Sequence, residues 1–137
     1  MILHYILDEQ GLPIPEPDFI KWAQWYDKAD RQVAETFFGA LRVSTVFLGL
    51  PNPDRRSDAV DMLYETMVFA DEATLARLLE LSETDDRSII ALFTGSIDIQ
   101  KRYRSREEAT QGHKRMCIFI ETCIAAGLLQ LKDVTEA

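Results

Sequence analysis

Two apolar segments near the middle of the chain constrain the fold more than any other feature. Residues 41–50 and 62–69 are rich in β-branched and aromatic side chains, while residues 51–60 carry prolines, aspartates and an asparagine. The first of these segments alternates between apolar and polar positions, then becomes apolar throughout, which is typical of an interior strand. The sequence therefore predicts an antiparallel hairpin with a long connection.

The segments before this hairpin are predicted to form a strand and a helix. Residues 2–7 have the composition of a short strand, and three prolines hold residues 10–17 extended. Asp18 is a plausible N-cap of a helix that we expect to reach about Glu35. The expected inner face of that helix repeats at intervals of three and four residues and comprises Phe19, Trp22, Tyr26, Ala29 and Val33.

The segments after the hairpin predict two more helices and at least one strand. Asp71 is expected to cap a short leucine-rich helix, and residues 89–94 fit either a strand or a helical turn. Residues 97–103 alternate as a half-exposed strand does. Ser105 and Glu108 form a capping box, which starts a helix expected to run to about Ala126.

These elements predict one α+β domain that spans residues 1–137, a usual length for a single domain. We expect a small antiparallel sheet of four or five strands with two main helices packed on one face. A short inserted helix is expected within an acidic insertion at about residues 71–96.

Charge and targeting signals favour a cytoplasmic protein. The 23 acidic residues exceed the 15 basic ones, and the net charge of −8 disfavours binding to nucleic acid or to an anionic membrane. The N-terminus lacks the features of a signal peptide, and no segment has the apolar length of a membrane span. Cys117 and Cys123 are expected to be reduced, because their spacing on a helix prevents a mutual disulfide.

Sequence motifs for catalysis are missing, so we expect no catalytic residue, no metal site and no cofactor. The glycines do not form a phosphate-binding loop, and neither a nucleophile elbow nor a paired zinc-ligand motif occurs. A site that combines His4, Glu65 and His113 stays open as an alternative. For Glu65, however, an ion pair with a basic residue of the last strand is the favoured interpretation.

Two charged segments are the candidate interaction sites. Residues 97–116 hold six basic and three acidic side chains, near a strand end and a helix start. They suit either a phosphate or acidic partner, or the solvated face of an edge strand. Residues 71–98 hold seven acidic and two basic side chains. The candidate contact residues are Glu80, Glu83, Asp85, Asp86, Lys101, Arg102, Arg104, Arg106, Lys114 and Arg115.

Three segments resemble a family of small uncharacterised bacteriophage and prophage proteins. They are residues 42–50 with 64–69, the opening residues 5–8, 13, 15–18 and 21–23, and the closing residues 102–109 followed by Gly112–His113. The chain departs from that pattern at Pro51–Asn52, where relatives have an Asp-His pair and a glycine-rich loop, and at the extra stretch 71–96. The resemblance implies expression in a bacterial host cell and implies no reaction.

The favoured function is therefore a non-enzymatic phage accessory protein that binds a host or phage protein. Inhibition of a host defence system through the acidic residues 71–98 is one concrete form. An RNA- or nucleotide-binding module that uses residues 101–115 is the first alternative, and a virion or assembly component is the second. Opposed charged surfaces also permit homo-oligomers.

Overall fold

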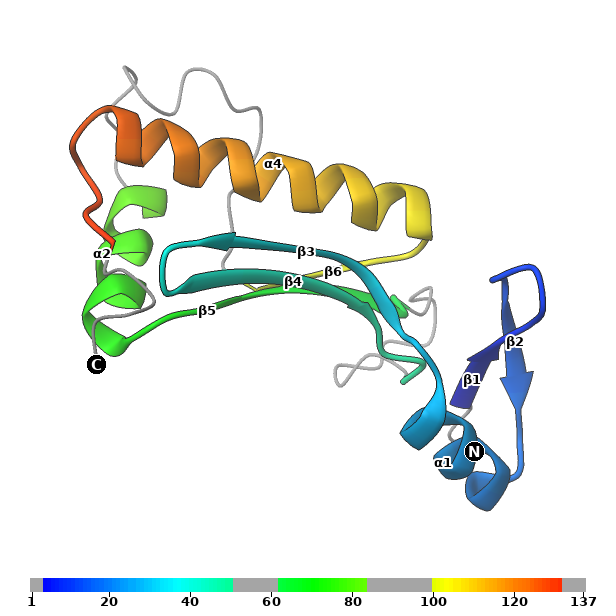
Figure 1. Ribbon diagram of the computed structural model, residues 1–137. Helices are drawn as coiled ribbons and strands as arrows, with labels where there is room; N and C mark the ends of the chain where they lie inside the picture. Colours follow the sequence, from blue (N-terminus) through cyan, green and yellow to red (C-terminus); the bar gives the residue numbers. More distant parts are fainter. Residues whose placement is uncertain (1–3, 51–61, 84–99, 132–137) are drawn as a thin grey trace.

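The computed structural model describes residues 4–50, 62–83 and 100–131, and these residues form an α+β fold (Figure 1). The predicted fold class is confirmed. The described elements are β1 (His4–Leu7), β2 (Pro13–Glu16), α1 (Phe19–Lys28), β3 (Gln32–Phe38), β4 (Leu41–Phe47), β5 (Tyr64–Phe69), α2 (Glu72–Glu83), β6 (Gln100–Tyr103) and α4 (Arg106–Ala125).

The strands form two antiparallel sheets. The main sheet has the order β3-β4-β5-β6, and β1 and β2 form a separate hairpin. The expected pairing of residues 41–50 with residues 62–69 is confirmed, since Val43 lies opposite Val68 and Phe47 lies opposite Tyr64. The strand expected within residues 97–103 appears as β6 and pairs with β5.

The helix expected to reach Glu35 is shorter than predicted, because the chain forms β3 instead. Helix α1 ends at Lys28, and the side chain of Asp30 accepts a hydrogen bond from the Gln32 N–H at 3.1 Å. Strand β3 then pairs with β4 through a two-residue turn at Gly39 and Ala40, where Gly39 has a φ of 57°. The pairing of β3 with a central strand outweighs the helical spacing, which had placed Val33 on the expected inner face of the helix.

The proline-rich segment also pairs, although only an extended conformation was expected of it. Pro13 and Pro15 lie in β2 opposite β1. Proline lacks an N–H donor, so it fits such a strand only where that position needs no ladder bond. The indole N–H of Trp22 donates to the Tyr5 carbonyl at 3.0 Å and joins α1 to this hairpin.

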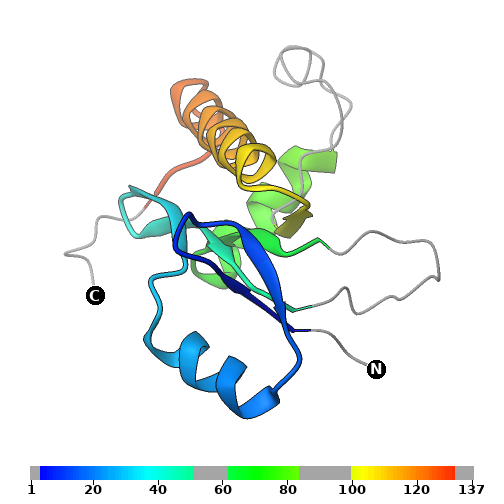
Figure 2. The ribbon, with the colours of Figure 1, turned by 90° about the vertical axis from the view of Figure 1, so that its right-hand side faces the viewer.

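The described helices take different positions relative to the two sheets. Helix α4 alone runs along the main sheet and contacts all four of its strands (Figure 1). Helix α1 packs on the hairpin, which lies between α1 and α4 in the view of Figure 2. The Trp25 ring of α1 contacts Phe47, in the same apolar cluster as Ala109 of α4. Helix α2 begins after Asp71, whose side chain accepts from the Thr74 N–H at 2.7 Å, so the predicted cap is confirmed.

The core beneath α4 has two apolar clusters separated by a polar layer. One cluster joins β4, β5, α2 and α4, with Leu78, Phe119 and Ile120 fully buried. The second cluster centres on Phe47 and Tyr64. Each of three elements carries a buried polar residue whose position in the sequence falls between residues of the two clusters. These polar residues are Thr45 on β4, Thr66 on β5 and His113 on α4.

Some expected features lie outside the described residues. These are the loop at residues 51–60, the strand or turn at 89–94, and the second half of the insertion, residues 84–96. Within the described ranges, no helix combines the length and the apolar character needed to cross a membrane.

Candidate anion-binding groove

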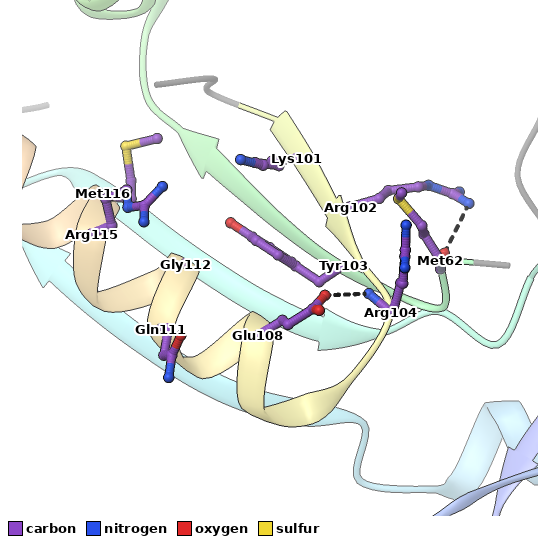
Figure 3. Close-up of a pocket in the computed structure, with 10 residues that line it drawn as sticks. All are labelled: Met62, Lys101, Arg102, Tyr103, Arg104, Glu108, Gln111, Gly112, Arg115 and Met116. Atoms are coloured by element: carbon purple, nitrogen blue, oxygen red, sulfur yellow. Dashed lines mark hydrogen bonds between the residues drawn. The ribbon is translucent and has the colours of Figure 1, made fainter. Parts of the chain in front are cut away.

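A groove of about 470 Å³ lies between β6 and the first half of α4 (Figure 3). Strand β6 and the residue after it contribute one wall, from Lys101 to Arg104. Helix α4 contributes the other wall through Glu108, Gln111, Gly112, Arg115 and Met116, and Met62 completes the lining. This volume falls within the range of about 300–1,000 Å³ that is usual for ligand pockets.

The junction between the two walls is fixed by the capping box, which the structure confirms. The Ser105 hydroxyl accepts a hydrogen bond from the Glu108 N–H at 3.1 Å. The Glu108 carboxylate in turn accepts from the Arg104 N–H at 3.2 Å, one residue before the cap. These two bonds turn the chain from β6 directly into α4.

The groove carries a surplus of positive charge. Within the described residues, no ion pair engages Lys101, Arg104 or Arg115. Arg102 differs, because its Nε lies 3.5 Å from the Glu65 carboxylate on the face of the sheet away from α4. Glu108 is the one acidic residue of the lining, and its carboxylate already receives the Arg104 N–H.

The inner wall of the groove is the ring of Tyr103, which packs against Gly112. A β-carbon at position 112 would overlap the ring and hydroxyl of Tyr103, so glycine is required at this crossing of strand and helix. The Lys101 ammonium lies 6.0 Å from the centre of the same ring, at the limit of a cation–π contact. An aromatic surface therefore lies among the cations.

The next residue of α4, His113, belongs to the polar layer of the core. Its Nδ1 hydrogen-bonds to the Thr45 hydroxyl at 2.8 Å and its Nε2 to the Thr36 hydroxyl at 2.9 Å. Thr45 also bonds to Thr66, so one imidazole links α4 to three strands. Burial lowers the pKa of His113, which favours the neutral ring that can donate from one nitrogen and accept at the other.

The alternative site of His4, Glu65 and His113 is not assembled. His4 lies on β1 and packs against the rings of Phe19 and Trp22. Glu65 and Thr66 are neighbours on β5, so Glu65 points to the sheet face opposite His113. The expected ion pair of Glu65 with the last strand is confirmed, and Gln100 also donates to this carboxylate at 3.0 Å. The described part of the chain contains no cluster of three metal-ligating side chains.

The ten candidate contact residues separate into two groups. Of the basic ones, Lys101, Arg102, Arg104 and Arg115 line the groove, whereas Arg106 and Lys114 are exposed on α4 outside the lining. The acidic candidates do not form a common surface within the residues that the structure describes. Glu80 is exposed and paired with Arg77 at 2.9 Å, Glu83 is the last residue of α2, and Asp85 and Asp86 lie outside the described residues.

Sequence reasoning missed the uncharged members of the groove, above all Gln111, Gly112 and Tyr103. Their signal was present, because Glu108, Gln111 and Arg115 recur at helical spacing on one side of α4. Only the crossing of α4 over β6 shows that this side lines a groove. Searches of family models, curated proteins and solved structures gave no match to the chain.

Proposed function

We propose that this chain is a non-enzymatic protein-interaction module that receives an acidic part of its partner in the groove between β6 and α4. One observation carries the proposal. Lys101, Arg104 and Arg115 form no ion pair within the described residues, yet all three line one groove in a chain with a net charge of −8. Local cations that keep no internal partner remain available to an anion.

This proposal moves the expected contact from the acidic to the basic side of the molecule. Reduced local dielectric in a groove strengthens attraction between charges, whereas exposed pairs such as Arg77–Glu80 contribute little. The strongly negative remainder of the chain repels long polyanions. A short acidic segment or patch of a protein is therefore favoured over RNA.

The resemblance to phage and prophage proteins supplies the setting of the proposal. The partner would be a host or phage protein in a bacterial cell, and inhibition of a defence protein is one outcome of such docking. An acidic partner segment that is captured in the groove would be withheld from its usual cationic target.

Retention on a resin that carries immobilised tetraglutamate, a short acidic peptide, tests the proposal. We expect the protein to bind at low salt and to elute as screening increases. The combined substitutions Lys101→Glu, Arg104→Glu and Arg115→Glu are expected to abolish retention. The matched control, Lys21→Glu, Lys28→Glu and Lys114→Glu, makes the same change in net charge at exposed positions outside the groove and should preserve retention.

Two results would contradict the proposal. Equal losses in both triple variants would show that net charge alone governs retention. Stronger binding to immobilised poly-uridylate, with the same loss in the groove variant, would favour the RNA-binding alternative.

A further inference from the structure

The groove follows the length of a strand, and this determines what shape of ligand it fits. Its lining includes four consecutive residues, Lys101 to Arg104. Lys101 and Tyr103 lie opposite Thr66 and Tyr64 and share their face of the sheet, whereas Arg102 lies opposite Glu65 on the other face. A groove lined by residues of both faces lies along the edge of β6, which is terminal among the described strands, in the order β3-β4-β5-β6.

The helical wall is equally long. Its residues, Glu108, Gln111, Gly112, Arg115 and Met116, form a single stripe over two turns of α4. Eight residue steps along an α-helix correspond to about 12 Å. An extended peptide rises about 3.3 Å per residue, so the groove matches about four residues of such a chain.

The positive charges are distributed along this length rather than gathered at one point. In Figure 3, Arg104 and Arg115 lie toward opposite ends of the lining, with Tyr103 between them. Gln111 adds an amide that both donates and accepts, as a peptide backbone requires. Met62 and Met116 add adaptable apolar contacts. A mononucleotide concentrates its charge at one end and matches this distribution less well.

We infer that the groove binds an extended acidic peptide segment of about four residues that runs along β6, with carboxylates set toward Lys101, Arg104 and Arg115. This inference rests on the proposed function and names the form of the partner, namely a linear segment rather than a folded acidic surface. Every second side chain of an extended peptide points the same way, so carboxylates at alternate positions would all face the groove and its cations.

Fluorescence anisotropy with synthetic peptides tests the inference. The probes are a fluorescein-labelled hexapeptide of alternating Glu and Val, the Glu-Val dipeptide, ATP and hexauridylate. We expect the hexapeptide to bind at least about tenfold more tightly than the dipeptide, because only the longer chain spans all three cations. ATP and hexauridylate are expected to compete at least about tenfold less well than unlabelled hexapeptide.

Two substitutions that leave the net charge unchanged test whether peptide binding depends on the open space of the groove. Gln111→Trp fills the groove, whereas Ile118→Trp adds the same ring at a position of α4 that is 52% exposed and outside the lining. We expect the first to weaken hexapeptide binding by about tenfold or more and the second to change it less than about twofold. Backbone amide shifts of the unsubstituted protein give a second readout, and changes should follow residues 100–104.

The outcomes distinguish this inference from the proposed function. Equal affinity for dipeptide and hexapeptide, or full binding by Gln111→Trp, would overturn the extended segment while retention on immobilised tetraglutamate still supported the acidic partner. Tighter binding of ATP or hexauridylate would overturn it in favour of a phosphate ligand. Absence of both peptide binding and retention would overturn both.

Discussion

The ring of Tyr103 on strand β6 lies against the backbone of Gly112 on helix α4. Alanine in place of glycine within a helix normally raises the free energy of unfolding by up to about 1 kcal/mol. At this position the added methyl group overlaps the tyrosine ring, so the helix or the ring must shift. The contact therefore makes Gly112→Ala destabilising, although a change from glycine to alanine within a helix usually stabilises the fold.

Gly112→Ala is expected to lower the free energy of unfolding by about 1–3 kcal/mol, the usual cost of overpacking. Urea denaturation measures this difference, with Gln111→Ala on the exposed side of the same turn as the control. In a Tyr103→Ala background the loss should vanish or become a gain. A stabilising effect of Gly112→Ala in the unsubstituted protein would disprove the steric account.

Acid is expected to destabilise the fold through His113. Its pKa is lowered in the folded protein by burial, below the ordinary value of 6.5 that applies to the unfolded chain. Above that value the ring is neutral in both states, and its titration does not change stability with pH. As the pH falls below 6.5, the unfolded chain takes up the proton first, and the free energy of unfolding decreases.

The slope from one such group cannot exceed about 1.4 kcal/mol per pH unit. Denaturation midpoints measured between pH 7.5 and pH 5 follow this loss, and His113→Gln removes the titrating group while keeping a donor and an acceptor near Thr45. The variant should be less stable at neutral pH yet show a shallower decline in acid. An unchanged decline would assign the acid sensitivity to other groups.

The buried pair of Glu65 and Arg102 is expected to be energetically coupled. The side chain of Glu65 is 8% exposed, and Gln100 supports the same carboxylate. A double-mutant cycle with Glu65→Ala and Arg102→Ala should give a coupling energy of about 1–3 kcal/mol. The exposed Arg77–Glu80 pair serves as the comparison and should give less than about 0.5 kcal/mol. Equal coupling in both cycles would contradict the effect of burial.

The two cysteines are expected to react slowly with iodoacetamide in the folded protein. Burial raises the pKa of both thiols, which lowers the fraction of reactive thiolate at pH 8. Cys117 is half-buried and Cys123 is fully buried, so Cys117 should be labelled first. Mass spectrometry of the Cys117→Ser and Cys123→Ser variants measures each rate. Faster labelling of Cys123 would indicate that the end of α4 opens locally.

Local signals in the sequence were enough to locate most elements. The capping box at Ser105, the cap at Asp71 and the hairpin strands act through neighbouring residues or through simple alternation, and the structure confirms them. Helix α4 was expected to run to about Ala126, and it ends at Ala125, with Gly127 soon after it at a φ of 74°. These features depend on short-range chemistry, which one sequence contains.

Features that depend on distant contacts were missed. Strand β3 was interpreted as helix because Val33 continues a helical spacing, whereas pairing with β4 decides its conformation. The burial of His113 depends on hydroxyls from Thr36, Thr45 and Thr66 on three strands. For the site, the basic residues were visible in the sequence. The groove itself became visible only through the crossing of α4 and β6.

Both walls of the groove belong to one uninterrupted stretch, residues 100–116, with Arg104 and Ser105 at the bend. Because this one bend sets the angle between the two walls, the width of the groove depends on the backbone torsions of a few residues. The remainder of the molecule acts as a scaffold that holds β6 through β5 and holds α4 through His113. Ligand preference can therefore change through outward-facing substitutions in this short stretch, without altering the residues that make the chain fold.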